Sequence, residues 1–400
     1  MAMYAGVGLS KDKDSYQAGY EACKLAMKEC GQNPDLTIVF SSVSFNQDDV
    51  VRGVREASNN AQLVGCTDAG EITNDGPAKN SVAVMAIASK DIVFHTGLGK
   101  NVKQGAKEAG EAVAREVKEK AGGSETLRSF IMFPDVLTGN GAEIVRGVLN
   151  VLGIHFPVIG GAAGDDFLFE KTYEYRDDEV VSGAVAGVGI SGKFVMGAGV
   201  RHGWMPIGTS MKVTKSEGSV VYELDHKPAV SIYEDYFGKK AEELKKEPLA
   251  RMAITYPLGI KLEGLDEYLI RDPITVGKIG EITCAAEIPQ GSEIRLMIGS
   301  KEKAVEAAQE AAKKLMKDFE QEGAKPKLVL MFNCIAREKL FGQKANDEIQ
   351  AVMEIIGKEV PLLGFYTYGE QAPVGGEIHN LEKCNSRFYN ETVVMFAIGE

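Results

Sequence analysis

Short runs of consecutive apolar residues alternate along the chain with segments in which apolar residues return every three or four positions. The runs Leu36–Phe40, Phe130–Phe133 and Leu328–Phe332 predict buried strands. Each run is followed by a polar loop, by a segment with the periodicity of one helix face, and by a second short strand that contains a glycine. The pattern predicts a chain in which strands and helices alternate.

The order strand, helix, strand, loop, strand occurs three times, which indicates an internal repeat. The helices of the first two copies share a Val-Arg-Gly-Val sequence, at Val51–Val54 and Val145–Val148. A hydrophobic strand closes each copy, at 81–88, 182–190 and 392–398. A further strand-to-helix element follows the first copy, at 92–120, and another precedes the third, at 294–319. We therefore expect an α/β, mixed α+β fold of layered mixed sheets covered by helices.

The segment between Gly203 and Gly291 has a different texture, with short alternating strands and turn residues. No stretch has the composition of a flexible linker, so we expect two packed lobes. The predicted domains are 1–225, which holds two repeats, and 226–400, which holds the short-strand section and the third repeat.

Composition narrows the classes of function. The chain has 400 residues, of which 44% are hydrophobic and 26% charged, as in globular proteins. Its 45 basic and 57 acidic residues give a net charge of -12, which argues against a nucleic-acid partner. The lysine-rich stretch from Lys239 to Lys246 is interrupted by glutamate, which is typical of a solvated helix.

The chain start has no basic segment followed by an apolar one, so no secretory signal is predicted. The longest apolar stretch, Ala184 to Val200, is interrupted by glycines, Ser191 and Lys193 and is too short to span a membrane. The six cysteines form no C-x-x-C pair, which is typical of reduced thiols. We expect a cytoplasmic protein with no membrane partner.

A glycine turn that ends in an acid recurs where each second strand ends. It runs from Gly65 to Glu71 and from Gly364 to Glu370 with identical spacing, and from Gly160 to Asp165 one residue shorter. Glycines let backbone amides approach a ligand, and a carboxylate can pair with a cationic or hydroxylic group. The recurrence predicts a site for a small polar ligand. The alternative is that these glycines only form tight turns.

The first strands of the repeats end in polar residues, which should border the same cleft because ligands gather at the carboxyl ends of strands in open α/β sheets. Arg337 follows the third of these ends and would either bind a ligand carboxylate or be a solvated charge. The predicted ligand-binding residues are Ser41, Ser42, Cys66, Thr67, Glu71, Gly161, Asp165, Asn333, Arg337, Tyr366, Thr367, Tyr368 and Glu370.

Signatures of common enzymes, metal sites and cofactor sites are missing from the sequence. The five histidines are scattered, so no metal site is predicted. Gly187–Gly192 matches a dinucleotide fingerprint, but another strand-like run follows where a helix is required, which predicts a hairpin. Cys66 and Cys334 have no histidine at a recognisable spacing and favour packing roles. No cofactor and no catalytic residue are predicted.

The chain resembles the FIST sensory proteins, which have a FIST-N and a FIST-C domain. The resemblance rests on the two turns at Gly65–Glu71 and Gly160–Asp165, and on three strings in the second half. These are Leu340–Gly342, Gly364–Glu370 and Phe388–Thr392. It covers nearly the whole chain. Two differences from the family are Tyr389, where a histidine is usual, and extra residues from His379 to Arg387.

The resemblance implies a sensory input module that binds small ligands, with amino acids among those proposed, and that passes its signal to a separate partner protein. In our leading hypothesis a cleft closes around a small zwitterion. Arg337 and the glycine-loop amides would hold its carboxylate, and Glu71, Asp165 or Glu370 its ammonium group. One alternative is an enzyme acting on a small carbonyl or amine compound with the loop carboxylates and Tyr366 or Tyr368. The other is a protein-interaction scaffold with an exposed apolar patch.

Overall fold

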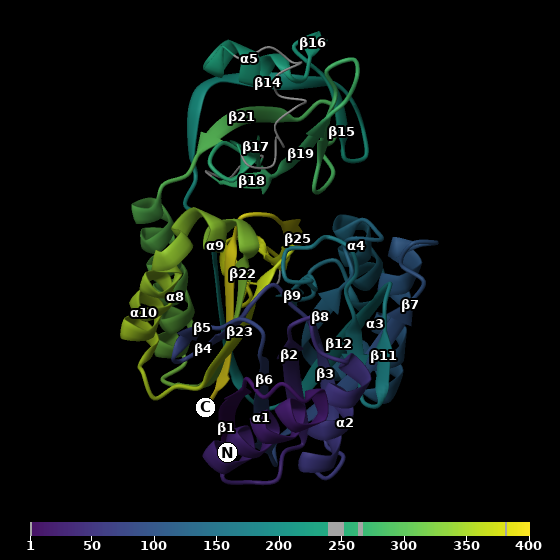
Figure 1. Ribbon diagram of the computed structural model, residues 1–400, viewed down its shortest axis with the longest axis vertical. Helices are drawn as coiled ribbons and strands as arrows, with labels where there is room; N and C mark the ends of the chain where they lie inside the picture. Colours follow the sequence, from purple (N-terminus) through teal and green to yellow (C-terminus); the bar gives the residue numbers. More distant parts are fainter. Residues whose placement is uncertain (1, 239–251, 263–266, 381) are drawn as a thin grey trace.

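The structure is a computed structural model that describes residues 2–238, 252–262, 267–380 and 382–400. The predicted solvated helix at 239–246 lies outside these residues. Two lobes are stacked along the long axis (Figure 1). The larger lobe, here called the body, holds three repeats, and the upper lobe is built from described residues between 205 and 298. The mixed α+β fold and the layered sheets with covering helices are confirmed.

The body has three six-stranded sheets with the same strand order. Each repeat supplies the first four strands of one sheet. An edge strand pairs with the closing strand, then come the two parallel strands, and then two short strands. The first-repeat sheet consists of β1 (Met3–Ser10), β6 (Val82–Ser89), β2 (Leu36–Ser41), β3 (Gln62–Thr67), β10 (Glu174–Arg176) and β11 (Glu179–Val181).

The other two sheets repeat this order with their own strands. The second-repeat sheet consists of β7 (Ile92–Lys100), β12 (Ala184–Gly192), β8 (Leu127–Pro134), β9 (Val158–Gly161), β24 (Glu370–Pro373) and β25 (Ser386–Tyr389). The third-repeat sheet consists of β13 (Val195–Arg201), β26 (Val393–Gly399), β22 (Pro326–Cys334), β23 (Leu362–Thr367), β4 (Glu71–Thr73) and β5 (Gly76–Pro77).

The two short strands of every sheet come from another repeat. The first sheet receives β10 and β11 from the second repeat, the second receives β24 and β25 from the third, and the third receives β4 and β5 from the first. This cyclic exchange ties the three repeats into one body.

Helices cover the outer faces of the three sheets (Figure 1). Helices α1 and α2 cover the first sheet, α3 and α4 the second, and α8 and α10 the third. The helices of the described residues are α1 (Ser15–Cys30), α2 (Gln47–Ala57), α3 (Ala106–Lys120), α4 (Gly141–Leu152), α5 (Ser231–Phe237), α8 (Lys301–Gln321), α9 (Ile335–Phe341) and α10 (Ala345–Ile356), with short 3-10 turns at Ser124–Thr126, Gly342–Lys344 and Val374–Gly376.

The inner faces of the sheets meet in a common apolar core. Phe40, Phe133 and Phe332 occupy equivalent positions, one or two residues before the carboxyl ends of β2, β8 and β22. The ring centroid of Phe133 lies 5.3 Å from that of Phe40 and 6.0 Å from that of Phe332. Alternate residues of the same strands point outward beneath the helices, which explains why these runs are apolar throughout.

The recurring strand glycines have a shared packing cause. A side-chain carbon added at Gly65, Gly160 or Gly364 would lie within 1.9, 2.0 and 2.0 Å of the carbonyl oxygen of Val39, Met132 and Met331 respectively. Each of these carbonyls belongs to the neighbouring parallel strand. The recurrence of these three glycines thus follows from close backbone approach.

Two predicted strand relationships are wrong. The hairpin at Gly187–Gly192 does not form, because β12 lies in the second-repeat sheet and the following strand, β13, in the third. The predicted strand 294–298 is β21 (Glu293–Ile298), which lies in the upper lobe, so its resemblance to β7 is not an equivalence. The strand equivalent to β7 in the third repeat is β13, and the upper lobe is inserted after it.

The upper lobe is an antiparallel sheet with α5 at one side (Figure 1). Its strands are β14 (Met205–Glu217), β15 (Val220–Leu224), β16 (Lys227–Pro228), β17 (Leu258–Lys261), β18 (Tyr268–Arg271), β19 (Pro273–Val276), β20 (Ile282–Cys284) and β21. Arg146 of α4 pairs with both oxygens of Glu287, at 2.6 and 2.8 Å, and Arg271 donates to the carbonyl of Phe388 at 3.2 Å. These contacts pack the upper lobe on the body. The predicted boundary after residue 225 falls within this lobe.

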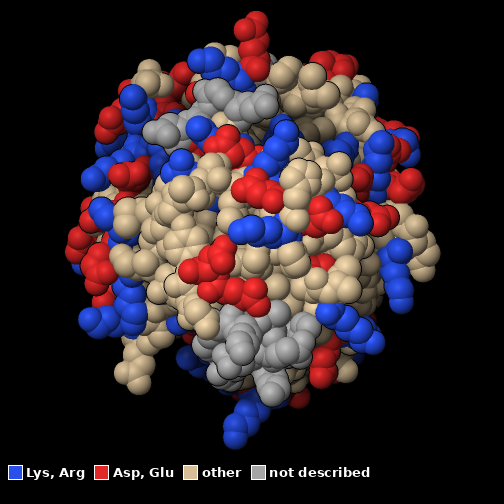
Figure 2. Space-filling model, turned by 90° about the horizontal axis from the view of Figure 1, so that it is seen from above, with Lys and Arg blue, Asp and Glu red and all other residues tan. Residues whose placement is uncertain are grey.

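The surface carries no dominant charge on the face seen from above, where basic and acidic residues are interspersed (Figure 2). Among the described helices, none has both the length and the apolar character that crossing a bilayer requires.

Candidate functional site

Three buried glutamates occupy equivalent places at the start of the exchanged strands. Glu71 begins β4, Glu174 begins β10 and Glu370 begins β24. The predicted third member of this set, Asp165, is not the equivalent residue. In the second repeat the turn is followed by a loop, residues 162–173, before the exchanged strand begins, and the Gly164-Asp165 pair in that loop resembles the turn by sequence alone.

Each glutamate accepts hydrogen bonds from its own repeat. Glu71 accepts from the amide of Ser42 at 3.1 Å and from the hydroxyl of Ser81 at 2.5 Å. Ser81 stands directly before the closing strand β6, so the carboxyl group holds the ends of β2 and β6 together.

The two other glutamates also accept from one amide and one hydroxyl, but from different positions of their repeats. Glu174 accepts from the amide of Ala184 at 3.1 Å and the hydroxyl of Thr172 at 3.0 Å. Glu370 accepts from the amide of Thr392 at 3.2 Å and from the hydroxyl of Thr367. Burial raises the pKa of all three carboxyl groups, to about 7 for Glu71. These contacts give Glu71 and Glu370 a structural role where the chain passes from one sheet to the next.

Arg337 is fully buried and its guanidinium is engaged within the chain. It pairs with Glu348 of α10 and donates to the carbonyls of Ala304, at 2.8 Å, and His202. Asn333 donates to the same Glu348 carboxylate at 2.7 Å. Arg337 is therefore not the solvated charge that was one of its two interpretations.

Asp165 organises a loop at the carboxyl edge of the first-repeat sheet. Its carboxylate accepts from the amides of Phe169, Glu170 and Lys171 at 2.8, 2.6 and 2.8 Å. The hydroxyl of Tyr368 in the third repeat donates a fourth hydrogen bond to it. The ring of Tyr368 also stacks on Phe169, with centroids 4.7 Å apart. The loop is thus anchored on a buried carboxylate and on a neighbouring repeat.

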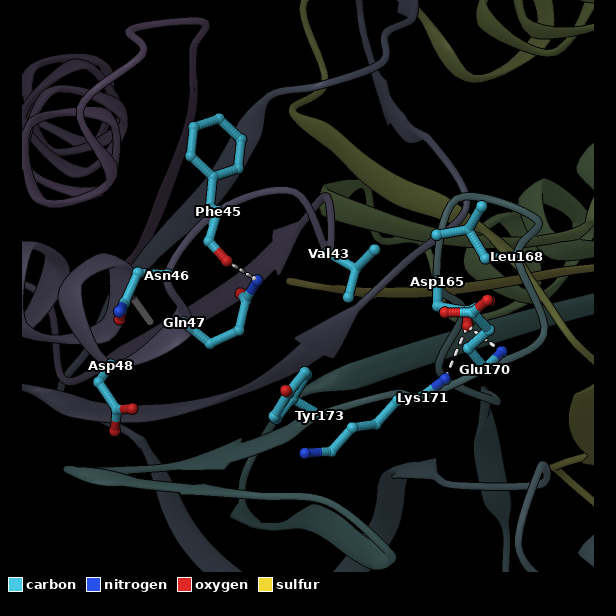
Figure 3. Close-up of a pocket in the computed structure, with 10 residues that line it drawn as sticks. All are labelled: Val43, Phe45, Asn46, Gln47, Asp48, Asp165, Leu168, Glu170, Lys171 and Tyr173. Carbon is cyan, nitrogen blue, oxygen red and sulfur yellow. Dashed lines mark hydrogen bonds between the residues drawn. The ribbon is translucent and has the colours of Figure 1, made fainter.

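A pocket of about 320 Å³ lies between this loop and the start of α2 (Figure 3). We call it the Lys171 pocket. In Figure 3 the Lys171 side chain extends from the Asp165 side and ends beside Tyr173. The Lys171 ammonium lies 4.6 Å from the centroid of the Tyr173 ring. The pocket is lined by Val43, Phe45, Asn46, Gln47, Asp48, Asp165, Leu168, Glu170, Lys171 and Tyr173.

Several predicted residues hold the walls of this pocket in place. Ser41 donates its hydroxyl to Gln47 at 2.9 Å, and the Gln47 amide donates to the carbonyls of Ser42 and Phe45 at 3.2 and 2.7 Å. Thr67 accepts from the amide of Tyr173 at 3.0 Å. Ser41, Ser42 and Thr67 therefore lie behind the pocket, and Asp165 is the one predicted residue that lines it.

The remaining predicted residues lie in the interior. Cys66 is buried, and burial raises its pKa well above that of a free thiol, as it does for Cys334, which fits the packing roles expected for both. All six cysteines are free and buried. Gly161 pairs with Glu370 between β9 and β24, and the hydroxyl of Tyr366 is buried without a hydrogen-bond partner among the described residues.

Three charged residues of the pocket, which make no ion pair within the described part of the chain, were missed from the sequence: Asp48, Glu170 and Lys171. Two signals pointed to them. Asn46 is the N-cap of α2 and follows the end of β2 after a short loop, which places Asp48 in the helix's first turn. Glu170 and Lys171 follow Asp165 within a polar loop. Neither signal is specific, because charged residues in loops and first turns are usually solvated.

The chain thus combines three repeats with exchanged strands, a pocket at the strand ends and an inserted upper lobe. The FIST N domain matches residues 35–227 and the FIST C domain matches residues 229–373. The chain belongs to the FIST family. FIST domains are sensory domains that bind small ligands in signalling.

Relatives cover nearly the full chain. An uncharacterized protein of Methanocaldococcus jannaschii is 26% identical over 371 residues, which cover 84% of this chain and 68% of that protein. An uncharacterized protein of Mycobacterium tuberculosis is 26% identical over 398 residues, covering 94% of this chain and 96% of that protein. Among solved structures, a cyanuric acid hydrolase from A. caulinodans overlaps 48% of this chain and 72% of its own, at 9% identity and a TM-score of 0.28, which is too loose to bear on function.

Proposed function

We propose that the protein is a sensory input module that binds a small polar ligand in the Lys171 pocket and passes the signal to a separate partner protein. Amino acids are the first ligand class to test. The observation that carries the proposal is that one pocket of about 320 Å³ is lined by an ammonium group, on Lys171, and by carboxylates, on Asp48 and Glu170. A zwitterion of a few heavy atoms matches that charge pattern and fits that volume.

The ligand carboxylate is expected at the Lys171 ammonium. Within the described residues this ammonium contacts the ring of Tyr173 and makes no ion pair. The first turn of α2 carries Asp48 and Asp49, whose carboxylates offset the positive end of the helix dipole on that side of the pocket. The ligand ammonium is expected at Glu170, because the carboxylate of Asp165 is already filled by four donors.

The loop that lines the pocket also reaches the surface, which suggests how the signal leaves the site. Phe167, Leu168 and Phe169 are 38%, 58% and 55% exposed. Leu168 lines the pocket and Phe169 stacks on Tyr368 of the third repeat. A ligand that fixes the loop would also fix the conformation of this apolar surface. A partner protein that binds the surface would then respond to the ligand.

The proposal is tested by calorimetry and thermal unfolding over the amino acids, with the Lys171→Met variant beside the unaltered chain. A binding amino acid at about one hundred times its Kd stabilises the fold by about 2.7 kcal/mol, and K171M removes that gain. Lys193→Met is the matched control, because Lys193 is an exposed lysine in a different part of the body. An amino acid that stabilises K171M as much as the unaltered chain would place the ligand elsewhere. No response to any amino acid would overturn the ligand class.

A further inference from the structure

A second cavity, which we call the Tyr389 cleft, lies where the upper lobe meets the third repeat. Its volume is about 600 Å³, within the usual range for small-molecule sites. Its lining comes from the chain crossing between the lobes, from β18 in the upper lobe, from α8, and from the loop between β25 and β26. Arg201, Trp204, Tyr268, Lys303, Tyr389 and Thr392 are among the residues that line it.

Tyr389 lines this cleft and carries an unused hydrogen-bonding group. Its side chain is only 5% exposed, and its hydroxyl has no hydrogen-bond partner among the described residues. The side-chain oxygen of the next residue, Asn390, is likewise buried and unpartnered. A buried hydroxyl without a partner costs free energy, so such a group in a cavity wall indicates that something else supplies the partner. Burial also raises the pKa of Tyr389, so its hydroxyl keeps its proton and can donate.

Arg201 supplies a cation to the same cleft, and its two carboxylate neighbours lie beyond hydrogen-bond distance. Its guanidinium donates to the carbonyl of Val200 at 2.7 Å, while the carboxylates of Glu267 and Glu310 stand 3.7 and 3.6 Å away. Those two separations exceed hydrogen-bond length, so the guanidinium retains donors for a further acceptor. Arg201 and Tyr389 both line the Tyr389 cleft, so both donors belong to its wall.

The other walls favour an apolar body with a single negative charge. Trp204, Met205 and Tyr268 provide apolar and aromatic surface, and the indole NH of Trp204 is already bonded to the carbonyl of Ile254 at 3.3 Å. Glu267, Glu306 and Glu310 add carboxylates to the lining. These disfavour every negative charge on a ligand, so they limit it to the single charge that Arg201 can neutralise.

We propose that the Tyr389 cleft is a binding site for a small monocarboxylate with an aromatic or apolar body, whose carboxylate accepts from the Tyr389 hydroxyl and the Arg201 guanidinium. The body of the ligand lies against Trp204 and Tyr268. Because Tyr268 belongs to the upper lobe and Tyr389 to the body, an occupied cleft joins the two lobes. This site is independent of the Lys171 pocket and of the function proposed for it.

The test compares 3-phenylpropanoate with its neutral amide by saturation-transfer NMR and calorimetry on the full chain. We expect the carboxylate to bind at least tenfold more tightly than the amide. Tyr389→Phe should weaken carboxylate binding about tenfold and leave amide binding unchanged. Tyr366→Phe is the matched control, since it removes another buried, unpartnered hydroxyl that does not line the cleft, and it should bind like the unaltered chain. K171M should also bind like the unaltered chain, which separates this site from the first.

Three results would overturn the proposal. These are equal affinity for the carboxylate and the amide, no carboxylate binding at millimolar concentration, and full carboxylate affinity in Y389F. Y389F should keep its unfolding midpoint, because the lost hydroxyl has no partner in the chain. If Y389F does not fold, the Arg201→Gln variant provides the same test. An unchanged preference of R201Q for the carboxylate over the amide would also reject the site.

Discussion

Tyr368 donates its hydroxyl to the carboxylate of Asp165, which lies 203 positions earlier in the chain. The bond joins the third repeat to the loop that lines the Lys171 pocket. It is possible because β24 of the third repeat is inserted beside β9 of the second, so that Gly161 and Glu370 become neighbours. The strand exchange thus brings a tyrosine and an aspartate from different repeats to one pocket wall.

Replacing Tyr368 with phenylalanine should therefore weaken both the fold and the pocket. A hydrogen bond to a charged group contributes about 1.5–3 kcal/mol, and we expect a loss of that size in the free energy of unfolding. The amides of Phe169, Glu170 and Lys171 keep Asp165 as their acceptor, but the Tyr368 hydroxyl no longer holds that carboxylate in place. Their hydrogen exchange should therefore become faster. Urea unfolding and amide exchange by NMR measure the two effects.

Tyr366→Phe is the control for this prediction. Tyr366 is another buried tyrosine two residues away, and its hydroxyl has no partner among the described residues. Its removal should leave the free energy of unfolding unchanged or slightly higher. Equal losses in the two variants would show that the Tyr368 hydroxyl contributes nothing specific.

The ion pair between Arg337 and Glu348 should be costly to break from one side. Both side chains are completely buried. Glu348→Gln leaves the guanidinium charged in the interior, and removal of one partner of such a pair costs about 3–5 kcal/mol. The double variant Arg337→Met, Glu348→Leu should lose less than the sum of its single variants, because no uncompensated charge remains. A double-mutant cycle in urea measures the difference, and strictly additive losses would contradict the prediction.

The raised pKa of Glu71 should make the stability of the fold depend on pH. Burial raises the pKa of this carboxyl group from 4.5 to about 7 in the folded chain. The folded state therefore holds the proton more tightly than the unfolded state does. The resulting stabilisation is fully present below pH 4.5 and is lost as the pH rises through 7. A shift of this size corresponds to about 3 kcal/mol.

Glu71→Gln removes this titrating group, while its amide keeps an acceptor for Ser42 and a donor for Ser81. The free energy of unfolding of the unaltered chain should fall relative to that of E71Q by up to about 3 kcal/mol between pH 4.5 and 7.5. The charge of Glu71 raises the pKa of Asp68, so this difference includes the response of the neighbouring carboxyl group. A difference that stays constant with pH would show that Glu71 titrates normally in the fold.

The order of strands and helices could be predicted because its signals are local. The apolar runs at β2, β8 and β22 are buried on both faces, by the common core on one side and helices on the other, so they appear as continuous runs. The exchange of strands could not be predicted. The exchanged strands β4, β5 and β10 are two or three residues long, too short for periodicity, and their pairing partners lie in another repeat.

The candidate site was only partly predictable for the same reason. The glycine-acid turn placed Glu71 and Glu370 in equivalent positions, but their burial depends on strand pairing that the sequence does not show. Glu174 could not be identified from its turn, because a loop separates the two. Asp165 lies in that loop and was predicted in place of Glu174. Asp165 nonetheless lines the Lys171 pocket, so the alignment error identified a residue of the site for a reason unrelated to the repeat.

The strand glycines provide a direct test of the packing that the three repeats share. In Gly364→Ala the added carbon would lie 2.0 Å from the carbonyl oxygen of Met331 on the adjacent strand, so β22 and β23 would have to move apart. We expect a loss of more than about 3 kcal/mol in the free energy of unfolding, in the range of overpacked cores and above. Gly323→Ala is the control, because nothing lies within 4 Å of its added carbon and its positive φ of 63° should cost only about 1 kcal/mol. Urea unfolding of both variants measures the contrast. Similar losses in the two would show that the close approach of parallel strands does not explain why glycine recurs at Gly65, Gly160 and Gly364.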